Sequence, residues 1–223
     1  MTARRLVIAI DGPSGAGKST AGRALAARLA YTFIDTGAMY RALALQAARA
    51  GVDPDDAPAL AALLHAARIE LLEGGRRVRL DDQDVTEAIR TREMSALASR
   101  VSVHPAVRRE MVARQRALGA AGGVVLDGRD IGTAVFPDAD VKFYLDADPL
   151  RRAERRVSEL GAAGGKAELE AVLREIRERD HADMTRADSP LVRAQGAIVL
   201  DTTALLPEHV IERMLDAVRA RAT

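Results

Sequence analysis

The chain has 223 residues and almost balanced charge, with 33 lysines and arginines against 32 aspartates and glutamates and a formal net charge of +1. This balance excludes a global electrostatic attraction to nucleic acid or to a membrane surface. The chain has no cysteine, which excludes disulfides and thiolate metal sites, and its aromatic content of 3% argues against base stacking on many aromatic side chains. We expect one large α/β domain with insertions, in a cytoplasmic monomer without nucleic-acid or membrane partners.

The strongest motif lies near the N-terminus. Residues 6–10 are an apolar, β-branched run of the kind found in buried parallel strands, and residues 20–30 place leucines at helical spacing. A strand, a glycine-rich loop and a helix in this order are the context in which a P-loop binds a nucleoside triphosphate. The candidate ATP-binding residues are Gly12, Pro13, Ser14, Gly15, Ala16, Gly17, Lys18, Ser19 and Thr20.

The residue types of this loop predict its chemistry. Its glycines let the backbone wrap around an anion with several N–H groups pointing inward, at the positive end of the following helix. Lys18 would neutralise the β- and γ-phosphates, and the Ser19 hydroxyl would ligate Mg²⁺. We therefore predict a nucleoside triphosphate as a substrate and Mg²⁺ as its cofactor. An ordinary glycine turn is the alternative, but it does not explain why motif and flanking pattern agree.

The rest of the chain continues a parallel α/β pattern. Core strands are predicted at residues 31–35, 123–126, 141–145 and 197–200, and helices at residues 40–50, 92–103, 106–118 and 207–221. A different pattern interrupts this order, with a short helix at 60–67, a hairpin of 68–72 and 77–80 around a glycine turn, and an edge segment at 85–89. We predict a core of residues 1–37, 98–150 and 171–223, an inserted subdomain at 38–97, and a lid at 151–170 that contains the small-residue patch 161–165.

The remaining motifs narrow the kind of P-loop protein. The chain contains no asparagine, so it lacks the Asn-Lys-x-Asp signature with which regulatory GTPases read guanine, and it has no Asp-x-x-Gly switch after a strand. Asp127 follows an apolar strand, as the acidic residue of a motor-type ATPase does, but it opens a motif dense in charge at residues 127–130. These absences argue against a switch GTPase, and the charged motif argues against a motor ATPase.

Arginine placement predicts a second anionic substrate. Five arginines fall near predicted strand ends or on flanking helices: Arg41, Arg108, Arg129, Arg179 and Arg186. In phosphoryl transfer the protein mainly positions two mutually repelling anions and neutralises their charge. We assign this catalytic role to Lys18, Arg41, Arg129 and Arg186. The helical spacing of Arg179, Asp183 and Arg186 fits either a face that grips the acceptor or an intrahelical salt-bridge stripe.

These motifs together resemble the bacterial cytidylate kinases over essentially the whole chain. The resemblance is carried by residues 10–18, 35–41, 89–91, 127–133, 135–137 and 178–180. The Asp-Gly-Arg-Asp segment at 127–130 is the most specific, because adenylate kinases share the fold but have Gly-Phe-Pro-Arg nearby instead. The resemblance implies a three-layer nucleoside monophosphate kinase fold with a monophosphate-binding insert and a short lid. It also implies transfer of the γ-phosphoryl group of ATP to CMP or dCMP, with Mg²⁺.

The resemblance also implies roles for single residues. The cytosine contacts of the family match Thr36, Ser99, Arg108 and Asp130, its acceptor-phosphate arginines match Arg41, Arg129 and Arg186, and its sugar contacts match Arg179 and Asp183. We add Tyr40, which follows the second strand, and the lid arginines Arg152 and Arg156. A carboxylate accepts from cytosine N4 and an arginine donates to N3 and O2, so such a site should reject uracil.

Two departures and two alternatives stand beside this interpretation. Thr36 replaces a serine of close relatives but keeps the hydroxyl, and Ser19 replaces a glycine of some members and restores the fuller P-loop pattern. The sequence leaves open another nucleoside monophosphate kinase, such as a uridylate kinase. It also leaves open a regulatory module that binds ATP without an acceptor.

Overall fold

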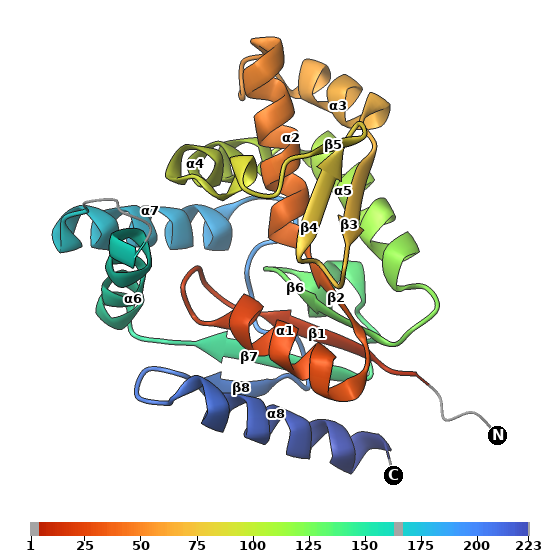
Figure 1. Cartoon of the computed structure of the whole chain (residues 1–223), viewed down its shortest axis with the longest axis vertical. Coiled ribbons are helices and arrows are strands. Elements are labelled where there is room, and N and C mark those ends of the chain that lie inside the picture. Colours follow the sequence, from red (N-terminus) through yellow and green to blue (C-terminus); the bar gives the residue numbers. More distant parts are fainter. Residues whose placement is uncertain (1–4, 163–166, 223) are drawn as a thin grey trace.

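A parallel five-stranded sheet forms the centre of the molecule. The structure is a computed structural model that describes residues 5–162 and 167–222. The sheet has the strand order β2-β6-β1-β7-β8, and all its neighbouring strands run parallel (Figure 1). Its strands are β1 (Val7–Asp11), β2 (Thr32–Asp35), β6 (Val124–Asp127), β7 (Val141–Asp146) and β8 (Ile198–Asp201). The parallel core sheet predicted from the apolar runs is confirmed.

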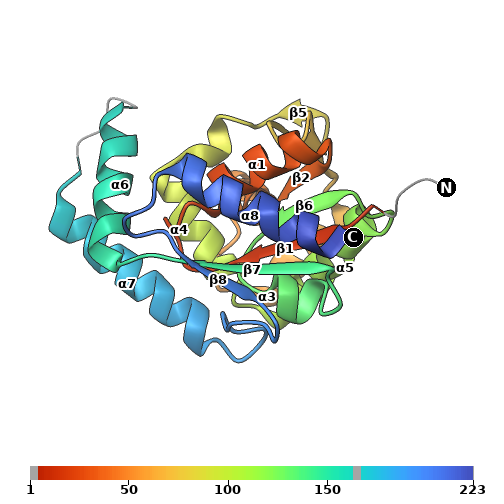
Figure 2. The ribbon, with the colours of Figure 1, turned by 90° about the horizontal axis from the view of Figure 1, so that it is seen from below.

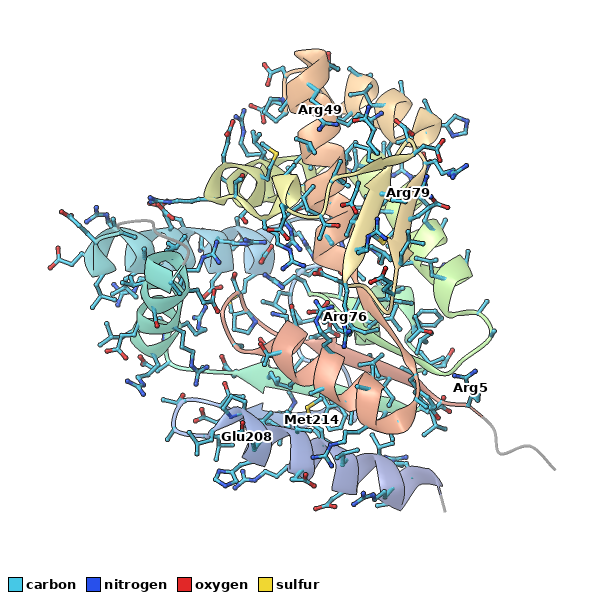
Figure 3. The ribbon with its side chains drawn as sticks, viewed as in Figure 1. Arg5, Arg49, Arg76, Arg79, Glu208 and Met214 are labelled. Atoms are coloured by element: carbon cyan, nitrogen blue, oxygen red, sulfur yellow. The ribbon has the colours of Figure 1, made fainter. Side chains whose placement is uncertain are left out.

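Helices cover both faces of this sheet. Helices α1 (Lys18–Leu29) and α8 (Pro207–Ala222) lie together on one face, where their apolar side chains share a buried cluster with Ile8 and Phe143 (Figure 2). Met214 of α8 points into the space between α8 and α1 (Figure 3). Helix α5 (Pro105–Gly119) and the short π-helix η2 (Ile131–Val135) cover the other face. The result is the predicted three-layer arrangement.

Every core strand ends in an aspartate. These residues are Asp11, Asp35, Asp127, Asp146 and Asp201. Asp35 is the N-cap of helix α2 (Thr36–Ala50) and accepts a hydrogen bond from the Ala38 amide. Asp146 and Asp201 accept from backbone amides one and two residues further along the chain. The carboxyl edge of the sheet, where ligands bind in open α/β folds, is thus lined with carboxylates that order the loops.

The inserted region has its own antiparallel sheet and its own apolar core. Strands β3 (Ile69–Leu72), β4 (Arg77–Leu80) and β5 (Gln83–Asp84) pair antiparallel in that order. Helices α2, α3 (Ala57–Ala66) and α4 (Arg92–Val101) pack into one buried cluster, together with Val107 and Met111 of α5. The predicted hairpin is confirmed with its glycine turn. The bounds 38–97 stay a prediction, because α5 shares this core.

Three details of the insert differ from the sequence predictions. The predicted edge segment at 85–89 is wrong: β5 ends at Asp84, and the 3₁₀ turn η1 (Ala88–Arg90) follows. The Ile89 amide donates a hydrogen bond to the Val85 carbonyl, which closes a turn, and the side chains of both residues are buried in the same cluster. The helix predicted to begin at residue 40 begins at Thr36, and the helix predicted at 60 begins at Ala57.

Helices α6 (Pro149–Ala162) and α7 (Leu169–Thr185) pack against each other beside the carboxyl edge of the sheet (Figures 1 and 2). Of the small-residue patch predicted as a lid tip, residues 161 and 162 form the end of α6, and residues 163–165 lie outside the described residues. Arg186 is the C-cap of α7, one residue past the helix. Within residues 5–162 and 167–222, no helix is long and apolar enough to cross a membrane.

Candidate active site

The glycine-rich loop between β1 and α1 has the backbone of an anion cradle. Gly12, Gly15 and Gly17 have φ angles of 143°, 77° and 86°, a region that favours glycine. A Cβ at Gly12 would lie 1.9 Å from the Leu145 carbonyl oxygen, so no larger residue fits there. Helix α1 begins at Lys18, directly after the loop, so its first amide groups and its positive end face the same space.

Lys18 sits at the floor of this loop. Its side chain is 6% exposed, and its ammonium group donates a hydrogen bond of 2.6 Å to the Pro13 carbonyl. Burial, with the Arg129 guanidinium close by, holds the pKa of Lys18 well below its usual range. Arg179 acts on Lys18 in the same direction. A polyanion bound between these cations would therefore favour the charged lysine.

Ser19 and Asp127 form a second polar pair beside the loop. The Ser19 hydroxyl donates to Oδ2 of Asp127 at 2.5 Å, and Oδ1 of Asp127 is buried without a hydrogen-bond partner among the described residues. Burial, together with the nearby Asp35, raises the pKa of Asp127 to about 6. A hydroxyl and a carboxylate with a free oxygen suit Mg²⁺, which binds one or two protein oxygens together with phosphate oxygens.

Asp130 is the centre of a buried ionic cluster opposite the loop. Arg108 of α5 is 2% exposed and donates to Oδ2 of Asp130, while its guanidinium lies 5.9 Å from the ring centroid of Tyr40. Arg186 lies with Nη2 3.6 Å from Oδ1 of Asp130 and Nη1 3.7 Å from Oδ1 of Asp183. Three elements far apart in the sequence, α2, α5 and the end of α7, thus meet at the loop that follows β6.

The other predicted arginines continue this cluster toward Lys18. Arg129 donates from Nε to Asp183 at 2.7 Å, and Arg41 donates to Asp35 at 3.1 Å. Burial and, to a smaller extent, the positive charge of Arg129 lower the pKa of Arg179 to about 10. Nε of Arg179 has no hydrogen-bond partner among the described residues. The predicted arginines are therefore brought together, each beside a carboxylate or another arginine, in an arrangement that can exchange these partners for a phosphate.

Four predicted residues are placed less directly. The Thr36 hydroxyl is buried and donates to the Asp127 carbonyl at 2.6 Å, which leaves it only its acceptor capacity. Ser99 is half-buried on α4, and its carbonyl accepts from the Ser102 hydroxyl. The structure separates the two lid arginines, because Arg152 is buried whereas Arg156 is 35% exposed and pairs with Glu159 on its own helix.

Sequence reasoning missed several carboxylates of the site. Asp11 accepts hydrogen bonds from the amides of Ile131 and Gly132, at 2.8 and 2.7 Å, and so fixes the loop directly after Asp130. Burial raises the pKa of Asp11 to about 6. Asp35 holds Arg41, and Asp180 pairs with Arg152. The aspartate at the end of each apolar strand run was the available signal for Asp11 and Asp35. Asp180 lies in the segment 178–180, which carries the family resemblance, and that was its signal.

Known proteins with high sequence similarity to this chain are cytidylate kinases. The family model described as cytidylate kinase matches residues 8–220. The chain is 50% identical over 220 residues to a cytidylate kinase of Syntrophotalea carbinolica, covering 98% of this chain and 94% of the relative. It is 51% identical over 215 residues to a cytidylate kinase of Symbiobacterium thermophilum, covering 95% of each chain.

Solved structures show the same fold at low sequence identity. TT1252 from Thermus thermophilus has a TM-score of 0.50 and 24% identity, covering 99% of each chain. A gluconokinase from Sinorhizobium meliloti has a TM-score of 0.52 and 15% identity, covering 98% of this chain and 94% of the other. The full-length match to the family model, and the identity of about one half to its members, show that this chain belongs to the cytidylate kinase family.

Proposed function

We propose that this cytidylate kinase transfers the γ-phosphoryl group of ATP to CMP or dCMP between the glycine-rich loop and the Asp130 cluster. ATP would bind with its phosphates on the amides of residues 12–20, and Lys18 would move from the Pro13 carbonyl to the β- and γ-phosphates. Among the alternatives, family membership favours this function over a uridylate kinase or a regulatory module without an acceptor.

The acceptor would bind where the arginines meet. Asp130 would accept from cytosine N4 while Arg108 donates to N3 and O2, with Thr36 and Ser99 at the edges of the base. Arg41, Arg129 and Arg186 would hold the acceptor phosphate, and Arg179 and Asp183 the sugar. Tyr40, whose ring lies beneath the Arg108 guanidinium, would support the base-reading group. Arg156, on the outer face of α6, would reach the donor phosphates only if the lid closes.

The transfer itself needs little covalent chemistry from the protein. An oxygen of the acceptor phosphate attacks the γ-phosphorus, and the bond from that phosphorus to the β–γ bridging oxygen breaks, giving CDP and ADP. The acceptor is already an anion, so no general base is required. Arg129 and Lys18 would stabilise the charge on the transferring group. Ser19 and Asp127 would hold Mg²⁺, which neutralises phosphate charge when bound.

The observation that carries this proposal is the continuous set of charged side chains between the Asp130 cluster and the floor of the glycine-rich loop. Arg186 lies beside both Asp130 and Asp183, and Asp183 accepts from Arg129, whose guanidinium is close enough to Lys18 to lower the pKa of that lysine. The loop and the cluster therefore border one space. Two anions bound in that space would be held end to end. The same cations would then relieve the repulsion between the anions that opposes transfer.

A coupled assay with four acceptors tests the proposal. We expect CMP and dCMP to be phosphorylated at rates at least about 100-fold above those of UMP and AMP, because a buried donor–acceptor set rejects a mismatched base strongly. Equal rates with AMP would remove the cytosine assignment. Calorimetric titration with CMP alone separates the alternatives, because a regulatory module would not bind CMP. We also propose a monomer in the cytoplasm, which light scattering and cell fractionation would test.

A further inference from the structure

Arg152 occupies an unusual position for a residue of a basic lid helix. It lies in the first turn of α6 and is 3% exposed. Each of its three guanidinium nitrogens donates to a different part of the protein: Nε to the Ala147 carbonyl at 2.9 Å, Nη1 to the Ser14 carbonyl at 2.9 Å, and Nη2 to Asp180 Oδ2 at 2.6 Å. One planar group therefore joins the end of β7, the glycine-rich loop and α7.

Two other arginines of the same helix do not share this position. Arg151 is 56% exposed and pairs with Glu154, three residues along α6. Arg156 also pairs within the helix, with Glu159. The burial of Arg152 is thus specific to one side chain and is not a property of the basic helix as a whole.

The contact with Ser14 acts on the peptide that joins Ser14 to Gly15. Gly15 follows Ser14 with φ at +77°, and a glycine at this position can let the Ser14–Gly15 peptide flip. A flipped peptide would turn the Ser14 carbonyl toward the phosphates and the Gly15 amide away from them. Arg152 holds that carbonyl, and its Cβ lies 3.1 Å from where a Gly15 Cβ would stand, so its stem packs against the same peptide.

A second carbonyl of the loop is held in the same way. The Ala16 carbonyl accepts from the Thr202 hydroxyl at 3.1 Å, and Arg155 of α6 donates to the Thr202 carbonyl. Helix α6 and the segment after β8 thus occupy two loop carbonyls with protein donors. A carbonyl that pointed into the loop would repel a phosphate. Because these two carbonyls bond to protein donors instead, the amides of the loop are the groups available to bind the anion.

The contact with Asp180 connects the same guanidinium to the acceptor side. Asp180 is buried and lies on α7 beside Arg179 and three residues before Asp183. Its second oxygen, Oδ1, has no hydrogen-bond partner among the described residues, so Arg152 is its principal counter-charge. A change in the position of α7 would therefore reach the glycine-rich loop through a single pair of charged groups.

We propose that Arg152 is a positioning residue that locks the Ser14–Gly15 peptide in its anion-binding orientation and, through Asp180, couples the loop to α7. This inference rests on the proposed ATP site at the glycine-rich loop. It assigns to Arg152 a fixed role in both the open and the closed enzyme, instead of a contact made only when a lid closes.

The test compares Arg152→Lys with the matched control Arg151→Lys. Lysine keeps the charge for Asp180 but cannot reach three acceptors from one planar group. We expect calorimetric titration with MgATP to show an affinity about tenfold lower for Arg152→Lys, as for the loss of one hydrogen bond from a charged donor. The affinity for CMP measured without ATP should stay within about twofold, and Arg151→Lys should match wild type in both titrations. Equal ATP affinity in Arg152→Lys and wild type would overturn the inference.

Two further measurements separate positioning from simple structural support. In Arg152→Ala, added guanidinium ion should restore ATP affinity, and it should have no effect on wild type; no rescue in a variant that still folds would contradict the inference. Asp180→Asn should weaken ATP binding in the same direction, and the double variant with Arg152→Lys should bind no more weakly than the worse single variant. Additive losses would contradict the coupling. These titrations need no turnover, so a failed acceptor assay would count against the proposed function alone.

Discussion

The guanidinium of Arg108 donates a hydrogen bond of 2.5 Å to Oδ2 of Asp130, and so joins helix α5 to the loop after β6 in the interior of the protein. Arg186 approaches the other oxygen of the same carboxylate. Asp130 is thus held in one orientation by two cations before any substrate binds. A nucleotide base that binds next to Asp130 would therefore find a hydrogen-bond acceptor in a fixed orientation.

Asp130→Asn should weaken the selection of CMP over UMP. Asparagine has nearly the size of aspartate and keeps one oxygen that can accept from Arg108. Its NH₂ group can donate to O4 of uracil, whereas the carboxylate of Asp130 would repel that oxygen. We expect the ratio of kcat/KM for CMP to that for UMP to fall about 10- to 100-fold, which corresponds to the usual 1–3 kcal/mol for a matched base contact. The KM for ATP should change less than about twofold, because Asp130 is not part of the proposed ATP site.

The control for this variant is Asp138→Asn, an exposed aspartate further along the same segment. It should leave the CMP to UMP ratio at the wild-type value. A ratio equally unchanged in Asp130→Asn would mean that Asp130 does not read the base.

Arg129→Ala should act mainly on turnover. Arg129 is nearly buried, donates to Asp183, and acts on the pKa of Lys18, which places it between the two proposed phosphate sites. We expect kcat to fall about 10³-fold, because an arginine that stabilises the transferring phosphoryl group contributes on that scale. Steady-state kinetics with both substrates saturating would measure this fall. Arg174→Ala, an exposed change on α7, should keep normal turnover, and near-normal turnover in Arg129→Ala would place that residue away from the reacting phosphate.

The acid side of the pH profile should reflect two buried aspartates. Burial raises the pKa values of Asp11 and Asp127 to about 6, so both are ionised at pH 8 and protonated at pH 4. Protonation of Asp11 would weaken its hydrogen bonds to the two backbone amides that follow Asp130. Protonation of Asp127 would remove the negative charge that is proposed to bind Mg²⁺. We expect kcat/KM for ATP to fall below pH 6 with a limiting slope steeper than that of one proton. A flat profile between pH 5 and 7 would contradict this assignment.

Asp127→Asn should stabilise the fold and weaken activity. The folded-state pKa of Asp127 lies above its unfolded value of 3.8, so its contribution to stability is present at pH values below the unfolded pKa and is lost as the pH rises through about 6. Asparagine removes the buried charge that is unfavourable at pH 8. We expect a higher Tm than wild type at pH 8, by about 3 °C for each kcal/mol gained, and no difference at pH 4.

The same variant should bind Mg²⁺ more weakly, with a 10- to 100-fold rise in the Mg²⁺ concentration for half-maximal activity, as is usual when a metal's supporting carboxylate is lost. Thermal denaturation across the pH range and a Mg²⁺ titration of the activity measure the two effects. A lower Tm at pH 8 would show that the carboxylate is stabilising in its ionised form, against the direction of its pKa.

Gly22→Ala tests the packing of α1 on the sheet. A Cβ at Gly22 would lie 2.8 Å from Cε2 of Phe33 and 3.1 Å from Cδ1 of Ile10, which are both buried. Overpacking lowers the free energy of unfolding by about 1–3 kcal/mol, and the better helix propensity of alanine offsets only about 1 kcal/mol of this loss. We expect a Tm lower by a few degrees, on the order of 2–4 °C per kcal/mol. Gly161→Ala in α6 meets no atom within 4 Å and should leave the Tm unchanged or raise it.

The core sheet could be predicted closely because a strand buried on both faces has a simple sequence pattern. All five strands lie within one residue of the predicted ranges, since each apolar run ends at a polar aspartate. The insert was harder. Val85 and Ile89 suggested a strand, but they are buried on one side of a turn and contribute to packing rather than to pairing. Asp35 as the N-cap of α2 would have corrected the start of that helix.

The arginines that meet in the structure could be predicted as a group from the sequence, but the bonds between them and the aspartates could not. The partners Arg129 and Asp183 are 54 positions apart, and Arg108 and Asp130 are 22 apart, so neither pair has a local signal. Arg152 shows the limit most clearly, because in the sequence it is one arginine among several on a basic helix. Its burial depends on how α6 meets the glycine-rich loop and α7, which only the folded chain determines.

The aspartate at the end of each core strand divides every strand into two parts with different tasks. The apolar residues before it are buried in the interior, whereas the carboxylate accepts hydrogen bonds from residues outside the sheet. Variation in the loops after these aspartates can therefore explore new acceptors while the strands and their final carboxylates stay constant. A combinatorial library confined to the loops that follow the core strands should contain many folded proteins that differ in substrate. This scaffold is therefore a practical starting point for altered nucleotide specificity.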